Sequence, residues 1–411
     1  MKSDPLALAA RRLARRLDEL GRVSDERGRL TRTFLSPAMR RANRLVGGWM
    51  REAGLKVRED EAGNLIGRSE GPPGSPTLLL GSHLDTVRDA GRFDGALGVL
   101  LPISALSELR RLGARLPFAV EVVGFSEEEG VRFSSAYLGS KAYTGTLRAG
   151  DLARRDRAGV TVRAALEAYG SRPFASPRPT HRAADLLGYL EVHIEQGPVL
   201  EAKRRAVGVV TAIAGQTRGD AVFRGRAGHA GTTPMAWRRD ALAGAAEWIL
   251  FAEALARRQP PVVATVGSVA AAPGVSNVIA GEAVLALDLR HPADGARRRA
   301  LRDLLAAGRR IARRRGLAFD WRLAQDHDAV ACDRNLTRRL AASVRAVQGA
   351  SSAMVSGAGH DGVVVSALAP IAMLFVRCRK GLSHHPDEFA APADLEVALR
   401  VTVAFIAGLA A

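Results

Sequence analysis

The 411-residue sequence contains few cysteines, lysines and aromatic residues, and it has no long apolar run. Its two cysteines, Cys332 and Cys378, cannot build a disulfide framework, and their spacing does not match a cysteine metal site. The absence of any stretch of 18 or more apolar residues excludes a transmembrane helix. The first 20 residues mix arginine with apolar residues, which predicts an amphipathic helix and not a signal peptide. We therefore expect a cytoplasmic protein with no membrane partner.

Arginine greatly outnumbers lysine, with 55 arginines against 5 lysines and a formal net charge of +18. A charge of this size raises the hypothesis of a nucleic-acid-binding protein. The arginines are spread along the whole chain, however, and aromatic residues that could stack on bases do not alternate with them. We interpret the charge as a bias toward arginine and expect no nucleic-acid partner. A steep salt dependence of DNA affinity without any hydrolysis would favour the alternative.

The chain is too long for one ordinary core, so we expect two domains. The hydrophobic pattern of the first third predicts helices at 5–20, 37–54 and 95–112 and strands at 77–82 and 116–125. This alternation is typical of an α/β fold with a helix-covered, mostly parallel sheet. Residues 214–326 instead predict the order strand, helix, strand, strand, helix, strand, which indicates an inserted, smaller α+β domain. Residues 1–213 and 327–411 would then form the two parts of the catalytic domain.

Polar residues follow the predicted strands of the α/β half at the point where each strand ends. They are His83, Asp85, Asp94, the three glutamates Glu127, Glu128 and Glu129, His193, His384 and His385. The carboxyl ends of strands form the binding crevice of an open α/β sheet. Imidazole and carboxylate together suit a divalent cation such as Zn²⁺ or Mn²⁺, and a cation would relieve the repulsion among the glutamates. The alternative is a set of separate surface turns.

Ten segments, in this order, carry a resemblance to a known family: HLDTV (83–87), GRFDGALGV (91–99), EEEGVRF (127–133), EVHIEQGPVLE (191–201), GHAGTTPM (228–235), RRDAL (238–242), PGVSNVIAGE (273–282), LDLRHP (287–292), SGAGHD (356–361) and GLSHHPDE (381–388). The sequence resembles the di-metal amidohydrolases of the M20 peptidase clan. The subgroup is that of the allantoate amidohydrolases and N-carbamoyl-L-amino-acid hydrolases. The resemblance covers the chain from about residue 37 to its end.

This resemblance implies two divalent metal ions per subunit, Zn²⁺ or Mn²⁺. One ion would be held by His83, Asp94 and His193, and the other by Asp94, Glu129 and His384. The resemblance also implies that Asp94 bridges the ions and that Glu128 is the general base. Asp85 is expected to orient His83 from behind. We expect Glu127 to be only a solvated neighbour of the site.

The resemblance further implies that the inserted domain is a lid and dimerisation domain that carries substrate-binding groups. These are His229, Asn277 and Arg290, with Gln196 added from the catalytic domain. Arg290 suits a carboxylate because its planar fork can bind both oxygens. His229 is expected to stabilise the oxyanion in the active site of the partner subunit, so a homodimer is implied.

The activity implied by the resemblance is hydrolysis of a linear C–N amide bond in a small ureido-carboxylate. We favour an allantoate amidohydrolase that releases ammonia and CO₂. Arg377 and Arg379 precede the His384 loop, and strand alternation would place both on one face, where a second ureido group could bind. Both could equally be surface arginines. The alternatives are an N-carbamoyl-L-amino-acid hydrolase or ureidoglycolate amidohydrolase and, more remotely, an aminoacylase or carboxypeptidase of the same clan.

Overall fold

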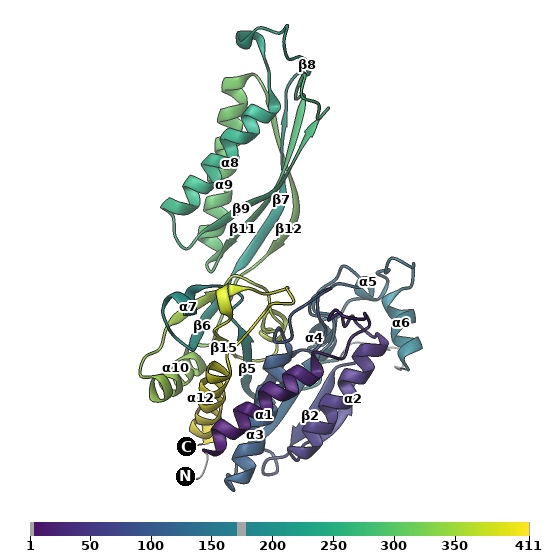
Figure 1. Cartoon of the computed structure of the whole chain (residues 1–411), viewed down its shortest axis with the longest axis vertical. Coiled ribbons are helices and arrows are strands. Elements are labelled where there is room, and N and C mark those ends of the chain that lie inside the picture. Colours follow the sequence, from purple (N-terminus) through teal and green to yellow (C-terminus); the bar gives the residue numbers. More distant parts are fainter. Residues whose placement is uncertain (1–3, 171–177, 411) are drawn as a thin grey trace. The chain divides into compact units, whose positions relative to one another are not determined.

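The computed structural model describes residues 4–170 and 178–410, and Figure 1 labels its helices and strands. The chain divides into two compact units. One comprises Met1–Thr211 and Cys332–Ala411, and the other comprises Ala212–Ala331. No helix within the described residues is long and apolar enough to cross a membrane. The two units are described separately below as the catalytic unit and the lid unit, names that follow the roles we predict for them.

The catalytic unit is built on a nine-stranded sheet with the order β1-β2-β4-β3-β5-β15-β6-β13, in which β14 pairs with β6. Its strands are β1 (Lys56–Glu59), β2 (Leu65–Ser69), β3 (Thr77–His83), β4 (Ala119–Phe125), β5 (Leu186–Ile194), β6 (Val207–Ile213), β13 (Val330–Ala331), β14 (Ala353–Ser356) and β15 (Ile371–Val376). The central strands β4, β3, β5 and β15 run parallel to their neighbours in this group. Their residues are almost all buried, as expected for strands covered on both faces. The predicted α/β class is confirmed.

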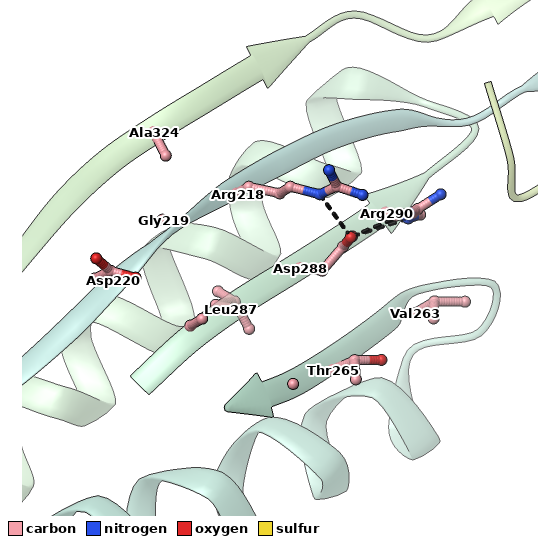
Figure 2. A pocket seen from close by; sticks show the side chains of 11 residues that line it. Arg218, Gly219, Asp220, Val263, Thr265, Leu287, Asp288, Arg290 and Ala324 are labelled. Carbon is pink, nitrogen blue, oxygen red and sulfur yellow. Dashed lines mark hydrogen bonds and ion pairs between the residues drawn. The ribbon is translucent and has the colours of Figure 1, made fainter. Parts of the chain in front are cut away.

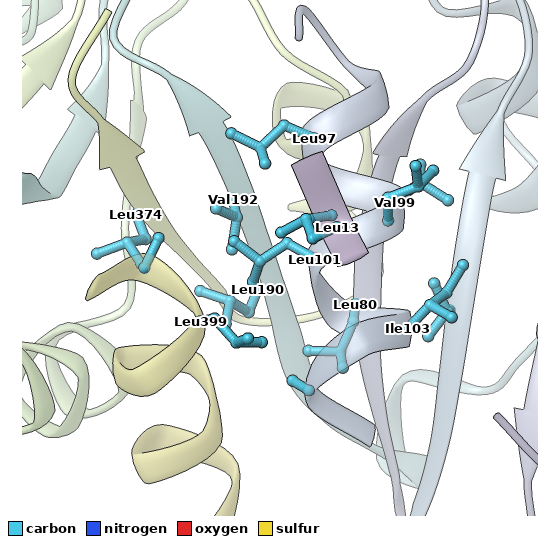
Figure 3. Close-up of a cluster of buried hydrophobic side chains, with 14 of the residues drawn as sticks. Leu13, Leu80, Leu97, Val99, Leu101, Ile103, Leu190, Val192, Leu374 and Leu399 are labelled. Atoms are coloured by element: carbon cyan, nitrogen blue, oxygen red, sulfur yellow. The ribbon is translucent and has the colours of Figure 1, made fainter. Parts of the chain in front are cut away.

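Helices cover this sheet. The longer ones are α1 (Pro5–Leu20), α2 (Pro37–Glu52), α3 (Ala96–Arg111), α10 (Arg334–Gln348) and α12 (Pro392–Ala410). The shorter ones are α4 (Leu138–Tyr143), α5 (Ala149–Leu152), α6 (Val162–Tyr169), α7 (Val199–Ala202) and α11 (Gly362–Val365), with 3-10 turns η1 (Ala183–Asp185) and η3 (Arg379–Gly381). Helix α1 is amphipathic as predicted, and Asp4 caps its first turn. Figure 3 shows Leu13 of α1 within the main core, which also includes Leu101 of α3 and Leu399 of α12.

The lid unit is a four-stranded antiparallel sheet with the order β12-β7-β11-β9. Its elements are β7 (Gly215–Arg224), β8 (Gly228–His229), η2 (Met235–Trp237), α8 (Ala241–Arg258), β9 (Val263–Ala272), β10 (Val278–Ile279), β11 (Glu282–His291), α9 (Asp294–Arg315) and β12 (Ala318–His327). The four long strands and two long helices follow the order expected from the sequence.

The lid sheet is two-sided, because alternate residues of β11 are buried and partly exposed. Leu285 and Leu287 are buried in one cluster with Trp248 of α8 and Leu304 of α9. Both helices lie on this face of the sheet (Figure 1). The opposite face of the sheet, which we call the open face, is covered by no described helix of this unit, and it carries the polar side chains of β7 and β11.

Candidate active site

The carboxyl ends of the central strands of the catalytic unit bring the predicted metal ligands together. His83 is the last residue of β3, His193 lies near the end of β5, and the three glutamates follow β4. Three groups have ligand atoms that all lie within 4.8 Å of one another: His83, Asp94 and His193; His83, Glu128 and Glu129; and Asp94, Glu129 and His384. The strand ends thus form one site and are not separate surface turns.

Asp94 lies at the centre of this site and belongs to two of the three groups. Its Oδ1 atom lies 3.1 Å from Nε2 of His193 and 3.6 Å from Nε2 of His83. Its other oxygen, Oδ2, lies 3.2 Å from Nε2 of His384. Burial alone would raise the pKa of Asp94, but its contacts with the three histidines hold that pKa well below the usual range. One carboxylate therefore presents an oxygen to each side of the site.

The histidines His83 and His193 are held through their Nδ1 atoms by main-chain carbonyls. Nδ1 of His83 lies 3.0 Å from the carbonyl oxygen of Asp85, and Nδ1 of His193 lies 2.9 Å from that of Ile194. A carbonyl oxygen only accepts, so each Nδ1 carries a hydrogen, and the neutral ring has its lone pair on Nε2. Within the described residues, the buried Nε2 of His193 makes no hydrogen bond of good geometry, although Oδ1 of Asp94 lies 3.1 Å away. This arrangement fits a divalent cation, because the ligand atoms are oriented in advance.

Glu128 and Glu129 lie on a turn that Asp85 holds in place. Their main-chain N–H groups donate to the two carboxylate oxygens of Asp85, each at 3.1 Å. The Asp85 carboxylate thus orients the glutamate turn, while its main-chain carbonyl contacts His83. Oε1 of Glu129 lies 3.5 Å from Nε2 of His384. Burial raises the pKa of Glu129 to about 7 and that of Glu128 well above its usual range, so a cation is what would keep both ionised.

Glu127 is buried, which makes the prediction of a solvated neighbour wrong. Its Oε1 accepts the main-chain N–H groups of Arg132 at 3.0 Å and Phe133 at 3.2 Å. Burial raises the pKa of Glu127 to about 8. The turn after β4 gives Glu127 a φ of 51°, and the carboxylate closes the following loop from inside. Glu127 is therefore a structural carboxylate of the glutamate turn.

Glu388 was not among the predicted site residues, yet it connects two of the loops that form the site. Its Oε1 accepts the main-chain N–H groups of Phe93 at 2.9 Å and Asp94 at 3.0 Å. Its Oε2 accepts the hydroxyl of Ser383 at 2.9 Å. A Cβ atom at Gly91 would lie 2.3 Å from the Glu388 side chain, so only glycine fits there. Glu388 lies in the segment GLSHHPDE, which carries the resemblance, but its position in the sequence does not distinguish it from an acidic residue on the surface.

Gln196 was predicted to contact substrate, and here it contacts the carboxylate of Asp94. Its Nε2 donates to Oδ2 of Asp94 at 3.0 Å and to the hydroxyl of Ser383 at 3.1 Å. Gln196 has a φ of 55° and His384 a φ of 56°, in the left-handed region that non-glycine residues rarely adopt. Such backbone conformations concentrate at functional sites, where the surrounding contacts maintain them. A substrate contact of Gln196 stays a prediction.

The predicted substrate-binding residues of the lid unit lie in two separate places. His229 and Asn277 are neighbours, because β8 pairs with β10 and the N–H of Ala230 donates to the carbonyl of Asn277 at 2.9 Å. Arg290 lies on β11 opposite Gln216, at the other end of the long β7–β11 pair. The segment with His229 adjoins the other end of β11, at Glu282 (Figure 1). The eight residue steps from Glu282 to Arg290 correspond to about 26 Å at roughly 3.3 Å per residue. One lid therefore does not bring Arg290 to His229.

The two arginines before the His384 loop are bound elsewhere. Strand β15 ends at Val376, so strand alternation does not extend to them. The guanidinium of Arg377 donates to both oxygens of Asp394, at 2.9 and 2.7 Å. The guanidinium of Arg379 lies 4.6 Å from the centre of the Phe389 ring. The expectation that they share a strand face is wrong, because the strand ends two residues earlier than its pattern suggested.

Comparison with known proteins gives a consistent result. A family model described as peptidase family M20/M25/M40 matches residues 79–408. The chain is 41% identical over 416 residues to an allantoate deiminase of Arabidopsis thaliana, covering 93% of this chain and 79% of that protein. It is 37% identical over 404 residues to an N-carbamoyl-L-amino-acid amidohydrolase of Pseudomonas sp. (strain NS671), covering 96% and 97%. A solved hydantoinase/carbamoylase family amidase from Burkholderia multivorans has a TM-score of 0.91 at 32% identity, with 98% of each chain covered. The chain belongs to the M20/M25/M40 peptidase family.

Proposed function

We propose that this protein is a metal-dependent amidohydrolase that cleaves a linear C–N bond of a ureido-carboxylate, with allantoate as its main substrate. The observation that carries the proposal is the pair of histidine–carboxylate groups that share Asp94. The names of the relatives support the same chemistry, since they act on allantoate or on N-carbamoyl amino acids. Allantoate and water would give ureidoglycine, ammonia and CO₂.

The residues present fit two divalent cations, Zn²⁺ or Mn²⁺. His83, Asp94 and His193 would hold one, and Asp94, Glu129 and His384 the other. Bound there, such ions would lower the pKa of a water molecule and polarise the substrate carbonyl. The fit rests on the donor set and on the buried Nε2 of His193, which among the described residues faces Oδ1 of Asp94 at 3.1 Å without the geometry of a hydrogen bond.

Glu128 is the proposed general base. It belongs to the group of His83 and Glu129 but not to either group that contains Asp94, which leaves its carboxylate available to move a proton. Glu128 would take a proton from the attacking water and deliver it to the leaving nitrogen as the C–N bond breaks. The carbamate formed in this step then loses CO₂. His229, if it lies beside the carbonyl oxygen, would stabilise the negative charge that develops there.

We also propose that the active enzyme is a homodimer in which two lids contribute to each site. The segment that carries His229 adjoins the Glu282 end of β11 (Figure 1), whereas Arg290 lies about 26 Å along that strand from Glu282, which is far longer than a ureido-carboxylate. If both residues contact one substrate molecule, they must come from different protomers. A two-fold symmetric dimer would then form two equivalent sites, each with Arg290 from one protomer and His229 from its partner.

Mixing two inactive variants tests this arrangement. His229→Ala and Arg290→Ala should each have little activity alone. After refolding or co-expression in equal amounts, half of the dimers should contain one of each chain, and one of their two sites should be intact. The expected activity is about a quarter of the wild-type value. Absence of any recovery in dimers shown by mass to be mixed would contradict shared sites.

Ammonia release from a panel of substrates tests the proposed reaction. The panel should contain allantoate, ureidoglycolate and N-carbamoyl amino acids, each assayed with added Mn²⁺ or Zn²⁺. Ammonia from allantoate at the highest kcat/KM supports the main proposal. A preference for an N-carbamoyl amino acid would favour the second candidate, which a relative at 37% identity, with 96% of this chain and 97% of that protein covered, supports. Cleavage of N-acyl amino acids without ammonia would show an aminoacylase and refute the proposed reaction.

A further inference from the structure

The open face of the lid sheet contains a cavity of about 610 Å³ (Figure 2). Its lining includes small residues, namely Gly219, Gly267, Ala286 and Ala324. Its charged lining consists of Arg218 and Asp220 from β7 and Asp288 and Arg290 from β11. All four alternate onto the open face, because they occupy even-numbered positions of two paired strands whose odd-numbered residues are buried. The cavity thus combines a lining rich in small residues with two arginines and two aspartates.

Asp288 holds the two arginines side by side. Its Oδ1 accepts Nε of Arg290 at 2.8 Å, and its Oδ2 accepts Nη2 of Arg290 at 2.8 Å and Nε of Arg218 at 2.9 Å. A third donor, Nε2 of Gln216, reaches the same Oδ2 at 2.8 Å. Burial acts to raise the pKa of Asp288, but the bonds from Arg290 and Arg218 hold it below the usual range. Together, the ionised side chains of Asp288, Arg290 and Arg218 carry a net positive charge.

Arg218 is accessible to a ligand. Its side chain is 47% exposed, and its hydrogen bond to Asp288 uses Nε. The outer edge of the guanidinium, with both terminal nitrogens, can therefore face the cavity. Because one oxygen of Asp288 binds both guanidinium groups, a molecule whose carboxylate lies on Arg290 has its neighbouring substituent within reach of Arg218.

Allantoate differs from an N-carbamoyl amino acid in that neighbouring substituent. Both carry a ureido group and a carboxylate on one carbon, but allantoate has a second ureido group where the amino acid has its side chain. We infer that Arg218 is a specificity-determining residue that binds the carbonyl oxygen of the second ureido group of allantoate. The inference rests on the proposed function, including the proposed binding of the carboxylate by Arg290.

The geometry gives this contact a physical reason. The two terminal N–H groups of a guanidinium can both donate to one ureido oxygen, and the donor is charged. Loss of a hydrogen bond to a charged group corresponds to roughly 10- to 100-fold in affinity. An apolar side chain in the same place offers Arg218 no acceptor, but water can still solvate this half-exposed guanidinium. Replacement of Arg218 should thus affect allantoate far more than an N-carbamoyl amino acid.

The test compares Arg218→Leu with the matched control Arg224→Leu. Arg224 lies on the same strand and the same face, pairs with Glu282 at 2.9 Å and is 41% exposed, but it does not line the cavity. The kcat/KM of each variant is measured for allantoate and for an N-carbamoyl amino acid with an apolar side chain. Arg218→Leu should lower the value for allantoate about 10- to 100-fold, mainly through KM, and change the other less than about threefold. Arg224→Leu should leave the ratio of the two values unchanged.

Several outcomes overturn the inference, and they differ from a failure of the proposed function. An equal loss for both substrates, or no loss for allantoate, removes Arg218 from substrate discrimination while the wild-type activity stands. A wild type that acts only on N-carbamoyl amino acids overturns the inference and leaves amidohydrolase chemistry in place. A wild type that releases ammonia from no ureido substrate overturns the proposed function, and the inference with it. Arg218→Gln, which keeps a polar side chain, should show the same selective loss if Arg218→Leu does not fold.

Discussion

Removal of the Asp94 carboxylate should abolish binding of both metal ions, whereas removal of His384 should abolish only one. Asp94 belongs to two of the candidate ligand groups through different oxygens, while His384 belongs to one. A four-ligand zinc site contributes roughly 10–16 kcal/mol, or about 2.5–4 kcal/mol per ligand. Loss of one ligand thus weakens binding by about 10²–10³-fold. Asp94→Ala applies that loss to both ions at once, and it also leaves three histidines without their shared carboxylate.

Metal analysis after equilibrium dialysis at a fixed free-metal concentration measures the effect. At a concentration that just saturates the wild type with two equivalents, His384→Ala should retain about one and Asp94→Ala none. His385→Ala is the matched control, because this adjacent exposed histidine faces Asp387 and belongs to no ligand group among the described residues; it should retain two. Thermal unfolding of each metal-free variant verifies its fold. Two equivalents bound to Asp94→Ala with affinity within tenfold of the wild type would refute the bridging role.

Three further predictions concern single residues of the site. Glu128→Gln should keep the metals but lower kcat by about 10³-fold, since general-base catalysis contributes roughly 10²–10⁴; elemental analysis with steady-state kinetics measures this, and near-normal turnover would contradict it. Glu388→Ala should weaken metal binding about 10- to 100-fold, whereas Glu388→Gln, which keeps an oxygen for the Phe93 and Asp94 N–H groups, should bind nearly as the wild type does; chelator competition compares them, and equal affinities would refute the role. The contact with Asp94 raises the pKa of metal-free His384 to about 9. A cation must displace that proton below pH 9, so the apparent affinity should rise at least about tenfold per pH unit from pH 6 to 8.5, and more steeply where Glu129, with a pKa of about 7, also releases a proton; a flat profile would contradict this.

The sequence was informative about the site because the candidate metal ligands lie where strands end. His83 and His193 occupy the last residues of strands whose apolar pattern is nearly continuous, and parallel strands end at a common edge. Short-range patterns therefore located them without knowledge of the three-dimensional structure. The end of β15 could not be predicted in this way. The residues after Val376 continue an alternating pattern, but the backbone leaves the strand there. The interpretation of Arg377 was wrong for that reason.

Residues that act through main-chain N–H groups could not be identified in the same way. Glu127 and Glu388 resemble surface acids in the sequence, and their burial depends on loop backbones that donate to them. Which carboxylate receives such N–H groups is set by turn conformation, and turn conformation is not encoded in a periodic pattern. The distance between His229 and Arg290 likewise required the strand register, because residues 61 positions apart in sequence can lie at either end of a strand pair.

The distribution of charge connects the arginine-rich composition with a carboxylate-rich site. The chain has a net charge of +18, but the buried charged groups around the site are mostly acids. Arg32 is a buried cation near Asp85, and burial lowers its pKa to about 10. Without metal, burial raises the pKa values of Glu128 and Glu129, so the site limits its negative charge by taking up protons. If the proposed cations bind, they must displace those protons, because a carboxylate coordinates a cation only in its ionised form. The fold therefore places its acids where a divalent cation can compensate them, while Arg32 is the buried arginine beside them.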